Sequence, residues 1–501
     1  MRNRMGKLKR NSIVALAAQI VNIISAFILP RLILSTFGSD VNGLVNSISQ
    51  FLQIIGLLEL GVGAVVESSL YKPLSERNNL KLSQIMTSAT KFYKKIAIVL
   101  LIYSVGLVML YPATVGQAYP FFDVAILIIA LSVNSFAQYY FGMVNALLLN
   151  ADQRSYIVQM LSIIATIANT VISVLLIYSG CSIQAVKVVS SFVFLSKPIF
   201  LNNYIKRHYQ INYHEVYEVE PIPQKWYGIA QHMAHIVLDS TDVVILTIFS
   251  SLSSVSVYSV YNLVTNGMRS LVLSVGTGMQ SLLGELIAKK EKGKLDTVFA
   301  RLDWLIHTVA VVCFGCTMAL VVPFVQIYTS GVTDINYVQS LFAFFISLAQ
   351  CFRCIRLPYN VVILAAGHYK QTQSNYIVAA LLNISISIFT VIRFGLVGVA
   401  IGTLVAFVYQ NIWMAHYISK HIVCWPFKNF IRQTLIDLIT LACGYAVTRS
   451  LYLGELNYVH WMLNGMLTSV IWIALSMIIN FIFYRERLRE IYYRYIRRLI
   501  G

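Results

Sequence analysis

The sequence predicts an all-α polytopic membrane protein with about fourteen transmembrane helices. Three observations support this fold class. Long apolar segments recur along the whole chain. Of its 501 residues, 58% are hydrophobic and only 12% are charged, which is more apolar surface than a soluble core needs. Lysine and arginine fall mostly on alternate connections between the apolar segments.

Each apolar segment is at or near the roughly 20 residues that a helix needs to cross a bilayer. The first segment follows a basic N-terminus but is far longer than the 7 to 15 or so apolar residues of a secretory signal. We therefore interpret it as a retained span. The candidate spans, in order, are 12–36, 41–70, 92–112, 120–149, 155–178, 183–205, 226–249, 254–287, 302–327, 337–366, 372–392, 396–418, 430–449 and 460–484.

The distribution of charge predicts the orientation in the membrane. If the N-terminus is cytoplasmic, the connections after the even-numbered spans are also inside. With both chain ends and Lys197, they hold 31 of the 38 basic residues. Among the outside connections, Arg393 and Arg449 are the exceptions. This bias satisfies the positive-inside rule with both termini in the cytoplasm.

The net charge of +18 does not indicate nucleic-acid binding. The basic residues lie beside the ends of the predicted spans, where anionic headgroups of the cytoplasmic leaflet attract them. We therefore expect membrane lipids as partners and no nucleic acid.

Short motifs repeat with a shift of about 215 residues and keep their order. Gly61-Val62-Gly63 corresponds to Gly276-Thr277-Gly278, and Tyr156-Ile157-Val158 corresponds to Tyr376-Ile377-Val378. Six spans per copy predict two lobes related by a pseudo-twofold axis along the membrane normal, with substrate bound between them.

The domain boundaries follow from this repeat and from the polar, proline-containing interval between its copies. The tail is predicted to lie as a helix on the cytoplasmic surface, and a frayed basic end is the alternative. The domains are an N-terminal six-helix lobe at 1–206, a cytoplasmic linker at 207–225, a C-terminal six-helix lobe at 226–419, helices 13 and 14 at 420–484 and a basic amphipathic cytoplasmic tail at 485–501.

Arginines inside the predicted spans are candidates for binding an anion. A central arginine costs about 2.5 to 3.5 kcal/mol on insertion scales, so each one requires a reason. Arg353 and Arg356 follow Gln350 at intervals of three along the tenth span, Arg269 lies near the middle of the eighth, and Arg31 lies near the outer end of the first. Facing water, they would form a cationic site whose planar forks suit phosphate oxygens. The alternatives are snorkelling for Arg31 and internal ion pairs for the others.

A stripe of titratable side chains lies on the seventh span. His232, His235, Asp239 and Asp242 are spaced three, four and three residues apart, which places them on one helical face. With Glu59 of the second span, they could form a proton or sodium relay. The alternative is that the carboxylates only balance the arginines.

Other site classes receive little support from the sequence. Cys313-x-x-Cys316 and Cys351-x-x-Cys354 lie inside apolar spans, so we interpret them as small packing residues and predict no metal site. The spacing of a P-loop is absent, and so is any nucleophile elbow. We therefore predict neither catalytic residues nor a bound cofactor, and a proton or sodium gradient is the energy source that we consider.

Several short motifs resemble those of bacterial polysaccharide repeat-unit flippases. These are the O-antigen and capsular members of a superfamily that also contains multidrug and toxic compound extruders and lipid II flippases. The similarity extends over most of the chain. Its motifs are Pro30-Arg31, Phe37-Gly38, Leu60-Gly61-Val62-Gly63, Ala151-Asp152-Gln153, Thr241-Asp242, Arg356-Leu357-Pro358 and Ala365-Ala366-Gly367.

The resemblance implies a flippase of the bacterial plasma (inner) membrane rather than an enzyme. Its cargo would be an oligosaccharide linked to undecaprenyl pyrophosphate, moved to the outer leaflet by alternating access for O-antigen or capsule biosynthesis. We expect a monomer that works beside a polysaccharide polymerase or other assembly proteins. The alternatives are a multidrug or other lipid-precursor exporter of the same superfamily and, from another class, a membrane polysaccharide polymerase or ligase.

Overall fold

The computed structural model describes residues 2–59, 61–115, 118–222 and 229–485; within these ranges the side chains of 2–9, 229–235, 275–278, 280–281, 288 and 369 are left out of the description. The described residues form helices joined by short connections and contain no strand. They divide into two compact units. Unit 1 comprises Met1–Val257 and Gly331–Ile335, and unit 2 comprises Tyr258–Ser330 and Asn336–Gly501.

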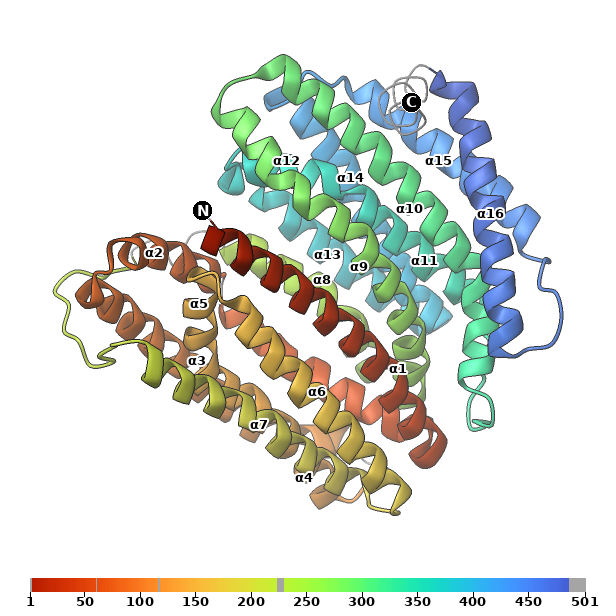
Figure 1. Ribbon diagram of the computed structural model, residues 1–501. Helices are drawn as coiled ribbons and strands as arrows, with labels where there is room; N and C mark the ends of the chain where they lie inside the picture. The colour runs from red at the N-terminus through yellow and green to blue at the C-terminus, as the bar shows by residue number, and fades with distance from the viewer. Residues whose placement is uncertain (1, 60, 116–117, 223–228, 486–501) are drawn as a thin grey trace. The chain divides into compact units, whose positions relative to one another are not determined.

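Unit 1 contains eight α-helices and two short segments of other helical type within the described residues. In Figure 1, α3, α4, α6 and α7 run side by side in it. The elements are α1 (Arg2–Gln53), the 3-10 helix η1 (Ile54–Glu59), α2 (Val62–Glu76), α3 (Asn79–Thr114), α4 (Phe121–Ala137), the π-helix η2 (Gln138–Gly142), α5 (Met143–Ala151), α6 (Ser155–Tyr178), α7 (Ile183–His208) and α8 (Ile229–Phe249).

A break at Gly38 divides α1 into the first predicted span and the start of the second. The backbone of Gly38 has φ 85° and ψ 176°, a conformation that residues with a side chain rarely adopt. Beyond the break, α1 approaches the start of α9 so closely that a Cβ on Gly43 would lie 1.8 Å from the carbonyl oxygen of Leu252. Gly38 therefore permits the break in α1, and Gly43 permits the close contact between α1 and the start of α9.

The polar stretch 209–222, predicted as part of a linker, packs against unit 1. Tyr213 donates a hydrogen bond to Asn145 of α5 at 2.8 Å, and the backbone of Asn212 donates to Ser83 of α3 at 3.1 Å. Ile222 is only 1% exposed. Burial raises the pKa of Tyr213 to about 12. This stretch is therefore fixed to the helices of unit 1 at several points.

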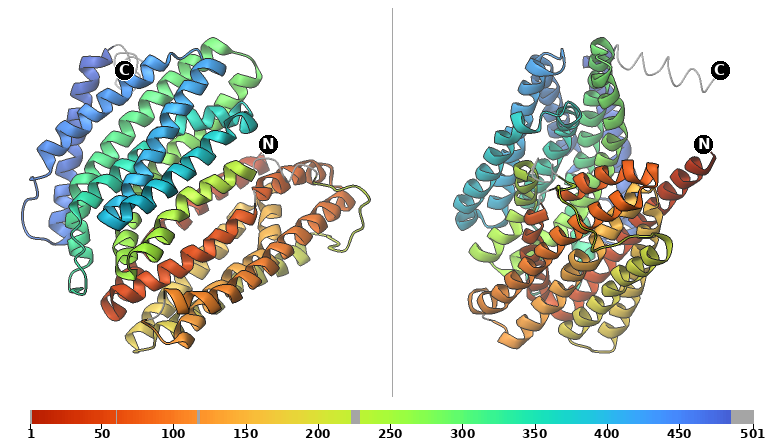
Figure 2. Two further views of the ribbon diagram at one scale, coloured as in Figure 1. Left: turned by 180° about the vertical axis from the view of Figure 1, so that it is seen from behind. Right: turned by 90° about the vertical axis from the view of Figure 1, so that its left-hand side faces the viewer.

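Unit 2 contains most of α9 and the seven helices that follow it in the described part of the chain, and these long helices also run side by side (Figure 2). The helices are α9 (Leu252–Ala288), α10 (Lys292–Tyr328), α11 (Ser340–Ile355), α12 (Leu357–Ala365), α13 (Tyr369–Phe394), α14 (Leu396–His421), α15 (Phe427–Thr448) and α16 (Tyr458–Phe483). An apolar cluster that includes Phe314, Cys351, Cys354 and Trp472 lies at its core.

Large apolar side chains are also exposed along the outer faces of the helices. Ile102 of α3 is 65% exposed, Phe389 of α13 is 78% exposed and Met466 of α16 is 63% exposed. Such exposure is expected where lipid tails, and not water, surround a helix. Among the described residues, eleven helical segments are long and apolar enough to cross a membrane. The chain is a multi-pass membrane protein, as predicted.

The positions of the helices match the predicted spans, whereas the two compact units have other boundaries than the predicted lobes. Helices occur at all fourteen predicted positions, although the first two spans share α1, and α8 and α9 are not among the eleven apolar segments. The units do not coincide with lobes at 1–206 and 226–419. Their main boundary lies inside α9, because α8 packs on α1 and η1, and unit 2 includes the last two helices. The tail from residue 486 lies outside the described residues.

Candidate functional site

Arg353 and Arg356 lie together at the junction of α11 and α12. Both are almost fully buried, at 8% and 7% exposed, and both guanidinium groups lie over the ring of Phe407 on α14, at 5.3 and 5.6 Å from its centroid. Arg356 also donates a hydrogen bond to the side-chain oxygen of Gln410. Two cations therefore share one aromatic ring inside unit 2, an arrangement that cation–π attraction supports.

Neutral amides with unused hydrogen-bonding atoms surround the arginine pair. Gln350 lies one helical turn before Arg353, and Gln410 and Asn411 lie on α14, where Asn411 donates to the carbonyl of Phe352 at 2.8 Å. All three amides are at most 4% exposed. Within the described part of the chain, Gln350 Oε1, Gln410 Nε2 and Asn411 Oδ1 have no hydrogen-bond partner. Buried polar atoms normally have one, so this region is equipped to bind a polar group.

Arg356 lies where α11 meets α12. Its backbone is right-handed helical, and it is the C-cap of α11 and the N-cap of α12, with Pro358 in the first turn of α12. Its N–H donates to the carbonyl of Phe352 at 3.1 Å, and its carbonyl accepts from the N–H of Asn360 at 3.1 Å. The helical path therefore continues through Arg356 and keeps Arg353 and Arg356 on one side of it.

The other two predicted arginines are more accessible. Arg269 of α9 belongs to unit 2 and is half-buried. It lies close enough to Cys354 to interact electrostatically with its thiol, as Arg353 and Arg356 also do. Arg31 of α1 belongs to unit 1 and is half-buried as well. Gln350, Arg353, Arg356 and Arg269 therefore lie in one part of unit 2.

Glu59 ends the 3-10 helix η1 and points toward α3. Its carboxylate accepts a hydrogen bond from the hydroxyl of Tyr93 at 3.2 Å. Gly63 provides the space, because a Cβ there would lie 3.2 Å from Glu59 Oε1 and 3.3 Å from Tyr93 Oη. Tyr139 stacks on Tyr93, so the carboxylate lies in a largely aromatic surrounding in unit 1.

The stripe on α8 is not uniform in its surroundings. Asp242 is 3% exposed, whereas Asp239 is exposed. The side chains of His232 and His235 lie outside the described part of the chain. The two carboxylates of this helix are therefore unequal, and Asp242 is the one shielded from solvent.

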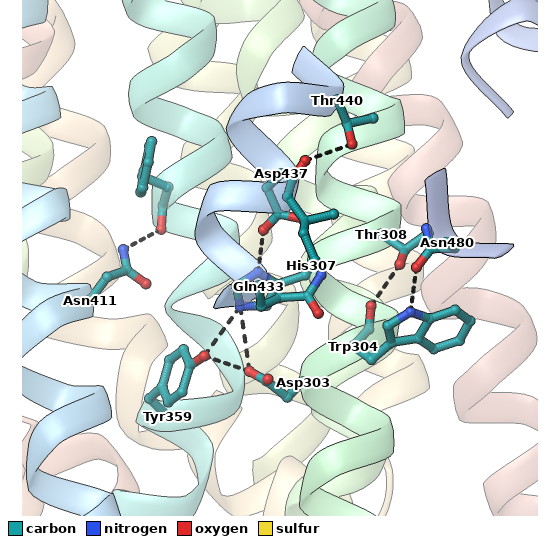
Figure 3. Close-up of polar contacts among 12 residues, drawn as sticks. Asp303, Trp304, His307, Thr308, Tyr359, Asn411, Gln433, Asp437, Thr440 and Asn480 are labelled. Atoms are coloured by element: carbon teal, nitrogen blue, oxygen red, sulfur yellow. Dashed lines mark hydrogen bonds and ion pairs between the residues drawn. The ribbon is translucent and has the colours of Figure 1, made fainter. Parts of the chain in front are cut away.

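A second polar cluster, around His307, was not predicted from the sequence (Figure 3). The His307 ring is fully buried. Its Nδ1 lies 2.5 Å from Asp437 on α15, and its Nε2 lies 3.2 Å from the hydroxyl of Tyr359 on α12 and 3.4 Å from Asp303 on its own helix. Tyr359 donates to Asp303 at 2.5 Å, and Gln433 donates to Asp437 at 3.2 Å. We call Asp303, His307, Tyr359, Gln433 and Asp437 the His307 cluster.

One signal for this cluster was present in the sequence. Asp303 and His307 are four residues apart within an apolar span, which places them on one face of a helix. Asp437 is 130 residues further along, in α15, where it is the only charged residue after Arg432. Helix periodicity relates residues of the same helix only, so the meeting of the two spans could not be derived from it.

The cysteine pairs belong to packing, as interpreted from the sequence. Cys316, Cys351 and Cys354 are buried in the apolar cluster of unit 2, with Cys313 packed against it. Among the described residues, no group of three or more His, Cys, Asp or Glu side chains has an arrangement that could hold a metal ion.

Solved structures of flippases and transporters share this fold. A lipid II flippase, MurJ, in an inward closed conformation has a TM-score of 0.69 and 14% identity, over 95% of this chain and 99% of that chain. An inward-facing multidrug resistance MATE family transporter of the MOP superfamily has a TM-score of 0.62 and 13% identity, over 81% and 98% of the two chains. The eukaryotic MATE transporter AtDTX14 has a TM-score of 0.57 and 12% identity, over 87% and 99%.

No family model and no curated protein matches the sequence. The likeness to the solved structures extends over nearly their whole length, although identity is low, so it concerns the fold. These neighbours are flippases and transporters and not enzymes. The chain thus has the fold of the MOP-superfamily flippases and transporters.

Proposed function

We propose that this protein is a flippase that moves oligosaccharides linked to undecaprenyl pyrophosphate across the bacterial plasma membrane. Alternating access would carry the cargo from the cytoplasmic to the outer leaflet, for the synthesis of a surface polysaccharide. The observation that carries the proposal is the buried pair Arg353 and Arg356, beside which three amide atoms have no hydrogen-bond partner in the described part of the chain. The MOP-type fold supports it, since a lipid flippase is among its members.

The chemistry of the arginine pair suits a diphosphate better than a cation. Each guanidinium offers a planar set of donors that can hold two phosphate oxygens. Gln350, Gln410 and Asn411 could hydrogen-bond the same headgroup or its first sugar. A bound anion would add a favourable interaction with both buried cations, which would offset part of the cost of burying them.

The test is the double variant Arg353→Ala with Arg356→Ala. We expect it to abolish surface polysaccharide while the protein still reaches the membrane, measured by polysaccharide staining and by immunoblotting of membranes. Arg393→Ala is the matched control, since Arg393 is an exposed arginine at the end of α13 and its loss should leave export unchanged.

A second pair of variants separates charge from geometry. Lysines at both positions keep the charge but lose the bidentate fork, so we expect export to fall by at least tenfold, about 1.4 kcal/mol or more of lost binding. Normal export in the alanine double variant would reject the arginine site.

We also propose that ion exchange through Glu59 and Asp242 drives transport. Asp242 is buried and Glu59 is half-buried in unit 1, where binding of a proton or sodium ion would neutralise a charge that is costly at membrane depth. Flux into vesicles should fall when the proton and sodium gradients are collapsed together. Unchanged flux would remove this coupling.

Export of drugs is the alternative that the MATE neighbours favour. A transporter of cationic drugs would be expected to have an acidic site, whereas the arginine pair is cationic. Drug sensitivity of a deletion strain distinguishes the two functions: the flippase predicts unchanged sensitivity together with loss of the surface polysaccharide.

A further inference from the structure

The His307 cluster joins three helices of unit 2 and has no part in the proposed cargo site. Asp303 and His307 come from α10, Tyr359 from α12, and Gln433 and Asp437 from α15. His307 and Tyr359 are 0% exposed, Asp303 is 1% exposed and Asp437 is 5% exposed. A cluster of four titratable groups without access to solvent is expensive to build unless each group is matched by the others.

The hydrogen bonds determine how many protons the cluster holds. Tyr359 donates its own proton to Asp303. The contact of His307 Nδ1 with Asp437 then needs a second proton, on the nitrogen or on the carboxylate. The contact of Nε2 with the oxygen of Tyr359 needs another proton, on Nε2. With two such protons, one imidazolium faces two carboxylates and the cluster carries a net charge of minus one. A third proton would make it neutral.

We propose that the His307 cluster is a site that binds and releases one proton, and that its loading is tied to movement of α15. On loading, a carboxylate oxygen of Asp303 or Asp437 forms an O–H bond with a proton delivered by water. On release the same bond breaks and the proton returns to water. The buried carboxylates favour loading, because the neutral state avoids an uncompensated charge in the interior.

Burial links this proton to helix movement. While α10, α12 and α15 are packed together, the four titratable groups are at most 5% exposed, so we expect exchange with solvent to require the helices to part. Loss of the proton leaves a negative cluster whose two carboxylates lie on different helices and repel each other. Gain of the proton removes this repulsion and stabilises the packed arrangement.

Few other titratable groups face the cluster from the neighbouring helices. The thiol of Cys351 on α11 interacts electrostatically with Asp437. The hydroxyl of Tyr484, just after α16, interacts in the same way with the hydroxyl of Tyr359. On α16 itself, the neutral Asn480 accepts a hydrogen bond from Trp304. These neighbours are a thiol, a hydroxyl and an amide, so the charged groups described in this site are the imidazole and the two carboxylates.

Infrared spectroscopy of the full-length protein in lipid bilayers tests the proposal. With aspartate labelled by carbon-13 at the side-chain carboxyl, we expect lowering the pH to produce an isotope-shifted carboxylic-acid band from a group without solvent contact. Asp303→Asn and Asp437→Asn should each remove the part of this band that comes from the cluster, since both carboxylates take part in holding the proton, whereas a band from the buried Asp242 would be unchanged by either substitution. Asp296→Asn is the matched control on α10, because Asp296 is partly exposed and accepts a hydrogen bond from the backbone of Cys424 outside the cluster.

The wild-type measurement keeps the test informative even if a variant folds poorly. An isotope-shifted band that is absent at every pH at which the protein stays folded overturns the proposal, as does a band that persists unchanged in both asparagine variants. Loss of the band on adding sodium at constant pH would assign the site to a metal cation instead. His307→Gln should shift the pH at which the band appears, which a purely structural histidine would not do.

This experiment requires no cargo and is independent of the arginine site. A negative result here would leave the flippase proposal intact, and failure of the arginine variants to affect export would leave the proton site intact.

Discussion

At the scale of single residues, Trp472 shows how tightly the core of unit 2 is assembled. Its ring is fully buried, and a Cβ on Gly315 of α10 or on Gly444 of α15 would lie only 2.4 Å from it. The indole of α16 is thus held between two glycines on neighbouring helices. Glycine is required at both positions because any side chain would occupy the space of the ring.

We predict that Trp472→Ala destabilises the protein by about 3 to 5 kcal/mol, because the surrounding helices cannot fill the cavity. Thermal unfolding of the purified protein in detergent should show a clearly lowered midpoint. Trp472→Phe is the control. It keeps most of the ring and removes an indole N–H that has no hydrogen-bond partner among the described residues, so its cost should be much smaller. Equal losses for both variants would contradict this account.

Buried charges at this scale are paired in two different ways. In the His307 cluster an imidazole lies between two carboxylates, so ionisable groups of the protein face each other. Arg353 and Arg356 instead contact an aromatic ring, and Arg356 also contacts a neutral amide. The first arrangement suits a proton and the second an anion, which is why the two proposals assign them different ligands.

At the scale of secondary structure elements, α13 and α14 pack at unusually short range. A Cβ on Gly398 would lie 2.4 Å from the backbone of Thr390, and one on Gly402 would lie 2.1 Å from Ser387 Oγ. The two glycines are four residues apart, a spacing that lets two membrane helices approach closely. The hydroxyl of Thr390 also donates to the carbonyl of Gly398 at 2.8 Å across this contact.

We predict that Gly402→Leu separates α13 from α14 and lowers the midpoint of thermal unfolding by several degrees, consistent with an overpacking cost of about 1 to 3 kcal/mol. Gly267→Leu is the matched control, since Gly267 also lies within a helix and a Cβ there would meet nothing within 4 Å. An unchanged midpoint for Gly402→Leu would show that the contact is not needed.

The loop 331–335 is attached to α1 through one carboxylate. Asp334 accepts hydrogen bonds from the backbone N–H and the hydroxyl of Ser39, both at 2.7 Å. Burial alone would raise the pKa of Asp334, but the two bonds from Ser39 and the backbone amides of Asp334 and Ile335 outweigh it and hold the pKa below its usual value.

A lowered pKa means that the ionised form of Asp334 stabilises the folded loop. This contribution is present above the usual pKa of 3.8 and is lost as the pH falls through the lower folded value. Because the carboxylate is largely exposed, we expect at most about 1 kcal/mol. Asp334→Asn should increase hydrogen exchange of this loop at neutral pH and remove its acid dependence, whereas Asp123→Asn, in the first turn of α4, should not. Unchanged exchange in Asp334→Asn would contradict the attachment.

At the scale of the whole molecule, orientation in the membrane follows from charge. Cys181 lies on a connection predicted to be outside, and the exposed Cys424 lies on a connection predicted to be inside. We expect a membrane-impermeant maleimide applied to spheroplasts to label Cys181 and not Cys424, and disruption of the membrane to expose Cys424. Each cysteine should be tested as the single remaining one. The reverse pattern would invert the predicted topology.

Most of the helices could be predicted from the sequence, because a span is recognised from its own hydropathy. The agreement fails where tertiary contacts decide the outcome. The predicted linker includes residues that pack on α3 and α5, and α8 packs on α1 and η1 of unit 1. Neither contact could be derived from hydropathy, because hydropathy describes each segment separately.

The candidate site was predictable in part for the same reason. Gln350, Arg353 and Arg356 share one helix face, so their proximity follows from spacing alone. Their neighbours on α14, Phe407 and Gln410, do not. The His307 cluster was missed because three of its five residues come from helices distant in the sequence.

By itself, then, the sequence determined the membrane location, the helical composition and the order of the spans, because hydropathy and charge act on each segment separately. Only the tertiary structure decided which polar residues meet: the arginine pair with Phe407 and Gln410, and His307 with Asp437 across 130 residues. Such meetings depend on the rotation and register of packed helices, and these are set by the combined fit of all their side chains.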